Sequence, residues 1–573
     1  MDLLCERLVP GAGRVGAAGY LARTARDRPE VAAAVATLTA ADDLAALAGT
    51  PAFDLVRALA VEAYYGDYAA PGHTGPTGHD DIGFHPPQAA RLRKDWSFLD
   101  EVPRTGDLGD AEADVVVVGS GAGGGLIAAQ LGRAGLDVLV LEAGQLRTAA
   151  AHTRFELEAN HRLWWPTRFA EIEGERPLAL LSGRCVGGTT LINTKVALRA
   201  ADFDVAAFHE RTGLLGPTGE PFTLADLEPY YQRVEADLGV RVRADWPPSV
   251  HTVRRGFQAL GADLAPVDSY TDFNCSRCGS CLQGCPTNAG KNALNTWLAP
   301  AMARGEIRVA TGVTVQRVLV EDGRVTGVEH AGGTVRAATV VLAAGALNTP
   351  QILRASPGYA AIDSPSTRLA GRTLGLHPAR LVYGLFDEIQ DCHQVYPITA
   401  HCLDFQRDFV MEATTIQDPV AFAASLVDEA GLPLWGTELT EVVRDYRRWA
   451  GLLVMATDDN TATAEPGDVF RKRLSGLERR RLSDGLAFAA DVLRAAGASR
   501  VVWTGLTTSH VQGSAPMGDD PARSVVGADG QSHDVTGLYV GDASLIPASL
   551  SVNPSLTIMA LATRVADAIA SRR

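Results

Sequence analysis

Apolar residues along the chain follow two different patterns. Some form short unbroken runs, as at residues 115–118 and 338–342, which are typical of buried parallel strands. Elsewhere they recur at every third or fourth position, as at residues 52–65 and 483–496, which is typical of amphipathic helices. Residues 308–345 are rich in the strand pattern. The mixture predicts an α/β fold.

A glycine-rich turn follows the apolar run at residues 115–118. Gly119, Gly121 and Gly124 occupy the glycine positions of G-x-G-x-x-G, which allow a tight turn, close approach of a pyrophosphate and close packing of the next helix. That helix would present its first N–H groups to the phosphates. The next strand ends at Glu142, 23 positions after Gly119, where a ribose-binding acid is expected. The unit predicts a Rossmann-like dinucleotide site, in preference to a purely structural βαβ unit.

A second turn carries residues that suit contact with a flat ligand. It runs over residues 187–193, where Gly188 lets the backbone approach a ligand and Thr189 and Asn193 offer hydrogen bonds. The strand at 338–342 leads into another strand–turn–helix edge. We expect both turns to border the dinucleotide site.

The C-terminal part of the chain supplies further candidates. An apolar strand at residues 538–540 leads to Gly541 and Asp542, which can approach a cofactor phosphate or ribityl chain. Asn553 and Pro554 then begin a helix, since proline suits a first helical turn. The positive end of that helix would stabilise an anionic neighbour.

Bulk properties limit the classes of function. The 573 residues are enough for two or three domains, and the formal net charge of −15 argues against a nucleic-acid partner. No apolar run is long enough for a transmembrane segment. The N-terminus lacks a basic region followed by an apolar core, so a cytoplasmic location is the default expectation.

From about residue 110 to the end, the chain resembles the glucose–methanol–choline (GMC) oxidoreductase family. The motifs that carry the resemblance are the glycine fingerprint with Glu142, the turn at 187–193, residues 344–350, His510, the turn at 541–544, and Asn553 with Pro554. The resemblance implies FAD rather than NAD as the cofactor. It implies a Rossmann-like FAD-binding domain, a substrate-binding α+β domain and oxidation of a small-molecule alcohol.

The resemblance also implies roles for single residues. His510 matches the active-site histidine, which would take the hydroxyl proton while a hydride moves to flavin N5. Asn553 matches the partner that orients the hydroxyl. Glu412 resembles the active-site glutamate of the cholesterol oxidase branch and would act as a base or substrate clamp, or else be a strand-surface carboxylate. For His377, which precedes a proline, we expect a satisfied structural histidine.

The segment before the glycine turn is predicted to be helical. In the stretches 9–13, 62–67 and 81–84 it resembles subunit 3 of membrane-bound gluconate 2-dehydrogenases, a small subunit that accompanies a flavin-bearing large subunit. The alternative is a helical cap without that relationship. In either case we expect an N-terminal helical module over residues 1–106.

Four cysteines lie within eleven residues. Cys275, Cys278, Cys281 and Cys285 form C-x₂-C-x₂-C-x₃-C-P, the spacing of bacterial ferredoxins. This favours an iron–sulfur cluster, 4Fe-4S or 3Fe-4S, over inert or disulfide-forming cysteines and over zinc. In the family, dehydrogenases that pair with a small subunit carry such a cluster.

These observations give predicted boundaries and three hypotheses of function. The boundaries are 1–106 for the helical module, 107–215, 265–355 and 505–573 for the FAD-binding parts, and 216–264 and 356–504 for the substrate domain. The first hypothesis is a dehydrogenase that passes electrons through the cluster to an external acceptor, such as a protein. The second is an alcohol oxidase that uses oxygen without a cluster. The third is a flavin-binding protein without redox activity. A long-chain or steroid alcohol and a sugar or amino-sugar hydroxyl are both open as substrates.

Overall fold

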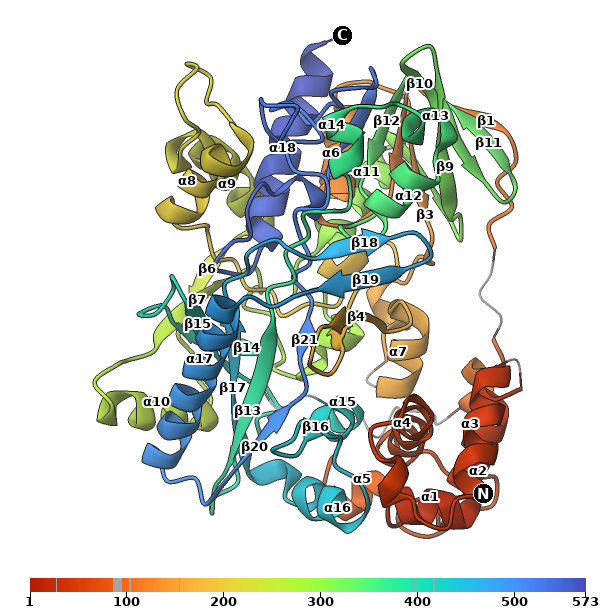
Figure 1. The fold of residues 1–573 in the computed structure, drawn as a ribbon, viewed down its shortest axis with the longest axis vertical. Coiled ribbons are helices and arrows are strands. Elements are labelled where there is room, and N and C mark those ends of the chain that lie inside the picture. The colour runs from red at the N-terminus through yellow and green to blue at the C-terminus, as the bar shows by residue number, and fades with distance from the viewer. Residues whose placement is uncertain are drawn as a thin grey trace.

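A parallel sheet forms the upper half of the molecule in the computed structural model (Figure 1), which describes residues 1–26, 28–85, 95–101, 105–153, 155–395, 397–415 and 418–572. The strand order is β22-β12-β2-β3-β8, and every pairing is parallel. The strands are β2 (Val115–Val118), β3 (Val138–Glu142), β8 (Ile307–Thr311), β12 (Thr339–Leu342) and β22 (Leu538–Val540). Their Val, Ile and Leu side chains are buried because helices and loops cover both faces. The predicted Rossmann-like α/β fold is confirmed.

Two long helices pack side by side against this sheet (Figure 1). They are α6 (Ala122–Arg133), which follows the glycine turn, and α18 (Ser555–Ser571), which ends the chain. The other helices of this half are α8 (Asp202–Thr212), α9 (Leu224–Leu238), α11 (Ala299–Ala303), α12 (Thr349–Ala355), α13 (Pro357–Ala360) and α14 (Pro365–Leu369). A smaller sheet lies beside them: β1 (Ala111–Glu112), β9 (Val315–Glu321), β10 (Arg324–His330) and β11 (Gly333–Arg336).

A large mixed sheet forms the lower half of the molecule. Its central strands are β13 (Ala379–Leu385), β14 (Ile398–Cys402), β15 (Phe409–Thr414), β17 (Trp449–Ala456), β20 (Arg500–Thr504) and β21 (Thr507–Thr508). Its outer strands are β4 (Arg168–Ile172), β5 (Leu178–Leu180), β6 (Arg241–Arg243), β7 (Ala265–Ser269), β16 (Leu426–Val427), β18 (Thr463–Glu465) and β19 (Val469–Lys472). Helix α17 (Gly476–Ala495), which Ser475 and Glu478 cap at its start, packs across the central strands.

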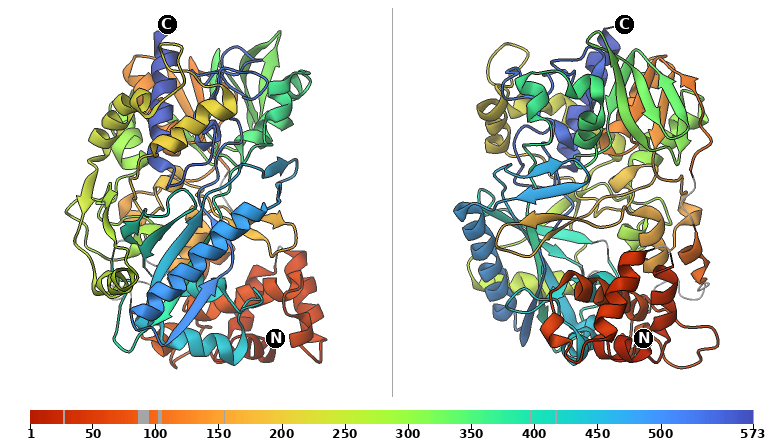
Figure 2. Two further views of the ribbon diagram at one scale, coloured as in Figure 1. Left: turned by 60° about the vertical axis from the view of Figure 1, so that its left-hand side comes forward. Right: turned by 45° about the vertical axis from the view of Figure 1, so that its right-hand side comes forward.

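The N-terminal helices share one hydrophobic core with this lower half. They are α1 (Asp2–Leu8), α2 (Ala17–Thr24), α3 (Pro29–Thr39), α4 (Pro51–Tyr65) and α5 (Gly78–Ile82). Figure 2 shows them gathered at the base of the molecule, beside α15 (Pro419–Ser425) and α16 (Gly436–Arg444). The remaining helices are α7 (Glu156–Leu163) and α10 (Pro248–Ala259). Phe53 and Trp449 belong to the same buried cluster, so the helices and the sheet stabilise each other.

A buried arginine joins α4 to α15. The Arg57 guanidinium donates to the carbonyl oxygens of Leu434 (2.6 Å), Ala424 (3.0 Å) and Ala423 (3.0 Å). Burial lowers the pKa of Arg57 to about 10, so the side chain stays charged at neutral pH. Because a cation is the best partner for carbonyls at a helix C-terminus, this contact fixes α15 on the N-terminal helices.

Replacing Arg57 with alanine is expected to lower the free energy of unfolding by at least about 3 kcal/mol, because the three carbonyls lose their donor inside the protein. Denaturant unfolding of the purified protein would measure this. Arg26→Ala is the matched control, since Arg26 forms an exposed ion pair with Asp100 and such pairs contribute about 0–1 kcal/mol. Equal losses in the two variants would contradict the prediction.

Candidate active site

A cavity of about 930 Å³ lies at the carboxyl ends of the parallel strands. Each strand of that sheet places a residue at or just beyond its end on the wall: Gly119 after β2, Glu142 at the end of β3, Val313 beyond β8, Ala343 after β12 and Asp542 beyond β22. This edge is where parallel α/β sheets bind ligands, because the loops and helix N-termini converge there. Val313 was missed by sequence reasoning, because it falls inside the stretch that the apolar pattern assigned to strands, whereas β8 ends at Thr311.

The glycine turn forms one end of the cavity and is held from below by Glu142. Ser120 donates to Glu142 Oε2 through its backbone N–H (3.1 Å) and its hydroxyl (2.6 Å), and Gly144 N–H donates to Oε1 (2.7 Å). Burial raises the pKa of Glu142, and these donors oppose that shift. Ser120 also accepts from Gly187 N–H at 3.0 Å, which links the two turns. Nothing in the sequence pattern singled out Ser120.

The middle glycine leaves open space for a ligand. A Cβ added to Gly121 would have Gly188 Cα, at 4.0 Å, as its nearest neighbour, so this face of the turn opens toward the cavity. Gly121 is also the N-cap of α6, which directs free N–H groups at the same space. The residues therefore fit the pyrophosphate of an FAD.

Two predicted cofactor residues instead lie behind the cavity wall and act in packing. A Cβ on Gly124 would lie 2.1 Å from the carbonyl oxygen of Gly119, so only glycine lets α6 pack this close to β2. A Cβ on Gly541 would lie 2.4 Å from the side chain of Ile127.

The remaining predicted cofactor residues line the cavity. Asp542 accepts hydrogen bonds from Gly345 N–H (2.8 Å) and the Thr349 hydroxyl (2.6 Å), which fixes the second strand–turn–helix edge. Burial raises the pKa of Asp542. On the facing side, Asn193 donates to the Tyr270 hydroxyl at 2.6 Å.

The turn at residues 187–193 supplies the other two predicted contacts. Gly188 lines the cavity directly opposite Gly121, and Thr189 lines it while its hydroxyl accepts from Gly183 N–H at 3.0 Å. A Cβ on Gly188 would lie 2.7 Å from Gly121 Cα, so glycine is required for the two turns to approach each other.

The other end of the cavity holds two histidines. His510 Nδ1 lies 3.3 Å from His377 Nδ1, and both rings border the cavity. Burial lowers the pKa of His510 to about 4, and burial together with the neighbouring His510 lowers that of His377 well below its ordinary value. Both rings are therefore neutral at pH 7. The expectation of a satisfied structural His377 is wrong, because its Nε2 is buried without a hydrogen-bond partner in the described residues.

Asn553 and Glu412 lie next to each other at the same end. Asn553 borders the cavity, and Glu412 is fully buried behind it on β15. Burial raises the pKa of Glu412 to about 8, which the Asn553 amide opposes only in part. The Asn553 amide is near enough to act on the carboxyl electrostatically, but among the described residues neither carboxyl oxygen has a partner at ordinary hydrogen-bond distance, nor does Asn553 Oδ1. A protonated Glu412 would supply the missing donor to Asn553.

Because native Glu412 holds a proton at neutral pH, we expect the free energy of unfolding to depend on pH. Because the native pKa is raised from 4.5 to about 8, native protein holds a proton that unfolded protein releases, and its stability falls as pH rises through this window. The loss is up to about 5 kcal/mol at 1.36 kcal/mol per pKa unit. Denaturant unfolding of wild type and Glu412→Gln at several pH values would measure it. In Glu412→Gln the free energy of unfolding is expected not to show this fall with pH. If it changes with pH equally in both proteins, the Glu412 carboxyl is ionised in the native protein.

The wall around the histidines is mainly apolar. It consists of Ala379 and Leu381 from β13, Ile398 from β14, and Leu453 and Met455 from β17. These strands pair with one another in the large sheet, so the wall is rigid. The arrangement suits an uncharged hydroxyl compound with an apolar body.

The cysteine run lies beside the cavity, where its Leu282 forms part of the wall. Cys275, Cys278, Cys281 and Cys285 are free and partly exposed thiols. Within the described ranges, no three His, Cys, Asp or Glu side chains are placed to hold a metal ion. The structure therefore does not support the iron–sulfur cluster that the spacing predicted.

A buried lysine adjoins the cysteine loop. Lys195 is fully buried and its ammonium donates to the carbonyl oxygen of Leu191 at 3.4 Å. Burial lowers the pKa of Lys195 to about 8, and the Cys281 and Cys285 thiols oppose the shift. No local sequence pattern had singled out this lysine.

Among the helices in the described ranges, none has the length and apolarity needed to cross a bilayer.

Comparison with known proteins gives consistent matches over most of the chain. The family models for GMC oxidoreductases match residues 52–379 and 454–562. A GMC-type oxidoreductase of uncharacterised function from Sinorhizobium fredii is 30% identical, covering 80% of this chain and 95% of its own.

Relatives with named activities cover similar shares. Long-chain-alcohol oxidase of Arabidopsis thaliana is 27% identical over 80% of this chain and 67% of its own. Paromamine 6′-oxidase of Streptomyces fradiae is 27% identical, and the match covers 85% of this chain and 95% of that protein. The solved structure of pyridoxine 4-oxidase from Mesorbium loti superposes with a TM-score of 0.60 at 19% identity, covering 79% of this chain and 98% of that one, and so shows the shared fold. The chain belongs to the GMC oxidoreductase family and is an FAD-dependent oxidoreductase that acts on CH–OH donors.

Proposed function

We propose that the protein oxidises the hydroxyl group of an uncharged alcohol with an apolar body, with His510 as the base. The observation that carries the proposal is the cavity itself. It joins the glycine-turn end, which fits FAD, to an apolar end that presents His510 and Asn553.

The chemistry follows from the protonation states of the three polar groups. Neutral His510 accepts the hydroxyl proton, and the Asn553 amide donates to the hydroxyl oxygen and orients it. Protonated Glu412 donates to Asn553 Oδ1 and so fixes the position of the amide beside the substrate. FAD, when bound, supplies the acceptor for the hydride that leaves the carbinol carbon.

The apolar wall favours one substrate class over the other. Leu381, Leu453 and Met455 offer no hydrogen bonds to the many hydroxyl and amino groups of an amino sugar. Oxidation of long-chain alcohols, as named for the plant relatives, therefore suits the cavity better than the amino-sugar oxidation named for the Streptomyces relative.

For the electron acceptor, we propose molecular oxygen. The relatives named as oxidases support this. The iron–sulfur relay to an external acceptor stays a prediction from the spacing of Cys275 to Cys285 alone. The relationship of residues 1–106 to a dehydrogenase small subunit, the domain boundaries and a cytoplasmic location also stay predictions.

The proposal is tested with flavin-loaded protein and 1-octanol, with D-glucosamine as the polar probe. Anaerobic 1-octanol is expected to bleach the flavin absorbance, and D-glucosamine is not. Air should then restore the absorbance with one hydrogen peroxide formed per alcohol oxidised. If no alcohol bleaches the flavin, the third hypothesis, a non-redox flavoprotein, is correct. Iron and acid-labile sulfide in anaerobically purified protein, with little peroxide, would instead establish the relay.

A further inference from the structure

His377 has an unusual backbone conformation at the edge of the active site. Its φ is +49°, in the left-handed region, and Pro378 follows it. Residues with a side chain rarely adopt this region, and a following proline restricts the backbone further. Such a conformation persists only where the surroundings hold it in place.

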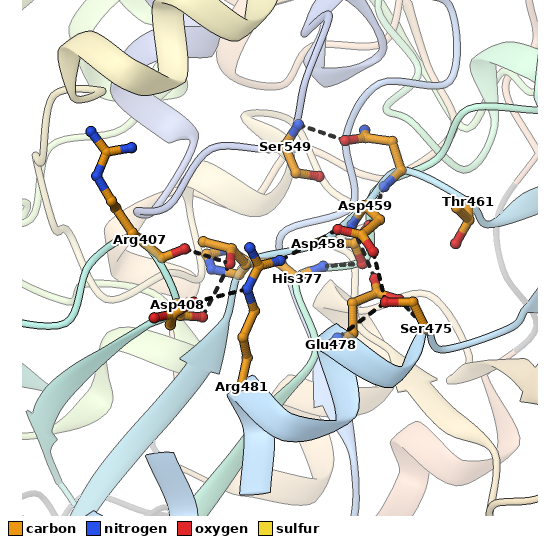
Figure 3. Close-up of polar contacts among 12 residues, drawn as sticks. His377, Arg407, Asp408, Asp458, Asp459, Thr461, Ser475, Glu478, Arg481 and Ser549 are labelled. Atoms are coloured by element: carbon orange, nitrogen blue, oxygen red, sulfur yellow. Dashed lines mark hydrogen bonds and ion pairs between the residues drawn. The ribbon is translucent and has the colours of Figure 1, made fainter. Parts of the chain in front are cut away.

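One carboxylate holds this turn. Asp458 Oδ2 accepts hydrogen bonds from the backbone N–H groups of Leu376 (3.0 Å) and His377 (3.3 Å), and Figure 3 shows Asp458 directed at His377. Asp458 Oδ1 accepts from Asn460 N–H at 2.7 Å, so the carboxylate is itself fixed. No bond reaches the imidazole of His377 from Asp458, so the effect passes through the backbone.

Asp458 is part of a buried ionic triad. Lys472 Nζ lies 3.0 Å from Asp458 and 2.7 Å from Glu478, and the three side chains are 0%, 0% and 1% exposed. Glu478 also accepts from Ser475 N–H at 2.7 Å, at the start of α17. Buried ion pairs are weak contributors to stability but are well suited to fixing one geometry. The triad therefore joins the His377 turn to two rigid elements, β19 and α17.

The geometry of the histidine pair sets the tautomers. The two Nδ1 atoms are 3.3 Å apart, so one must donate and the other accept. For Nε2 of His510 to accept a substrate proton, His510 must carry its hydrogen on Nδ1 and donate it to His377 Nδ1. His377 then carries its hydrogen on Nε2. Once His510 has accepted the substrate proton, the same bond stabilises its imidazolium.

We propose that Asp458 is a positioning residue which, through the backbone of His377, places the His377 ring to accept from His510 Nδ1 and so keeps His510 Nε2 as the base. The inference rests on the proposed role of His510. It assigns the buried Asp458–Lys472–Glu478 triad a part in catalysis at a distance, without contact with substrate or cofactor.

The test is a double-mutant cycle on flavin-loaded protein, reading the rate of anaerobic flavin reduction by 1-octanol and the dependence of that rate on its concentration. Asp458→Ala and His377→Ala are each expected to slow reduction about 100-fold, the effect of a misplaced reacting group. Substrate binding should change less than threefold. Because Asp458 acts through His377, the double variant should be no slower than His377→Ala. Independent roles would multiply the two effects and overturn the proposal.

Further variants keep the test decisive if Asp458→Ala does not fold. Asp458→Asn keeps an oxygen that can accept from the backbone, so it should recover most of the rate. Asp459→Asn is the matched control, since its carboxylate faces Ser475 and Arg481 and is 32% exposed. A wild-type rate in His377→Ala would refute the proposal. If His510→Ala blocks flavin reduction and the Asp458 and His377 variants do not, only the present inference fails. If no alcohol reduces the flavin of the wild-type protein, the proposed function fails as well.

Discussion

Replacing His510 with alanine is expected to slow flavin reduction by the alcohol roughly 10²–10⁴-fold while FAD stays bound. The imidazole is neutral, borders the cavity and has its Nδ1 turned to His377, so Nε2 is the nitrogen available to a substrate hydroxyl. Without it the hydroxyl proton must leave to water instead of to a positioned base. Stopped-flow measurement of anaerobic flavin bleaching would give the rate, and the flavin absorbance of the purified variant would give the FAD content.

Two further variants separate catalysis from folding. His510→Gln keeps a polar side chain of similar reach but cannot accept a proton at neutral pH, so it should be nearly as slow as the alanine variant. His251→Ala, on the exposed face of α10, should reduce at the wild-type rate. An unchanged rate in His510→Ala would remove this histidine from the mechanism.

Gly121→Val is expected to abolish FAD binding while the protein still folds. A Cβ added at Gly121 meets no protein atom outside the neighbouring backbone closer than 4.0 Å, and the φ of −70° suits any residue, so the polypeptide is expected to accommodate the branch. The side chain instead projects into the space where the pyrophosphate must approach the N-terminus of α6. FAD content after purification and after reconstitution with excess FAD would measure the loss.

Two comparison variants separate the loss of FAD binding from a general effect of replacing glycine. Gly124→Val should unfold or fail to accumulate, because its Cβ would lie 2.1 Å from a backbone carbonyl. Gly109→Ala should be neutral, since nothing lies within 4 Å of the new Cβ. Normal FAD content in Gly121→Val would show that the cofactor does not pass this turn.

Local patterns predicted the cofactor end of the site well. A strand, a glycine turn, a helix and an acid follow one another within 30 residues, so Gly119, Gly121 and Glu142 could be assigned before any contact was known. The carboxyl ends of parallel strands share one edge, which also explains why Asp542 reaches the same cavity. Glu142 nevertheless has a second task, since it holds Ser120, and no local pattern encodes that bond.

The chemical end of the site could not be predicted in the same way. His377 and His510 are 133 positions apart, and Asp458 comes from a third segment. Their relation depends on how β13, β17 and the loops between them pack, which sequence spacing does not determine. The cysteine run shows the limit of a local pattern: its spacing predicted cluster ligands, but no metal-binding group is found there among the described residues.

The contact between Arg57 and Leu434 spans 377 positions of the chain, and it has a consequence for biosynthesis. At about 5–20 residues per second, the ribosome needs on the order of half a minute to make the partner segment after α4 has emerged. During that interval the first helices have no strands against which to bury Phe53 and its neighbours. The nascent chain therefore presents an apolar surface early, and chaperone occupancy of this segment should set the yield of folded protein more than the stability of the finished molecule does.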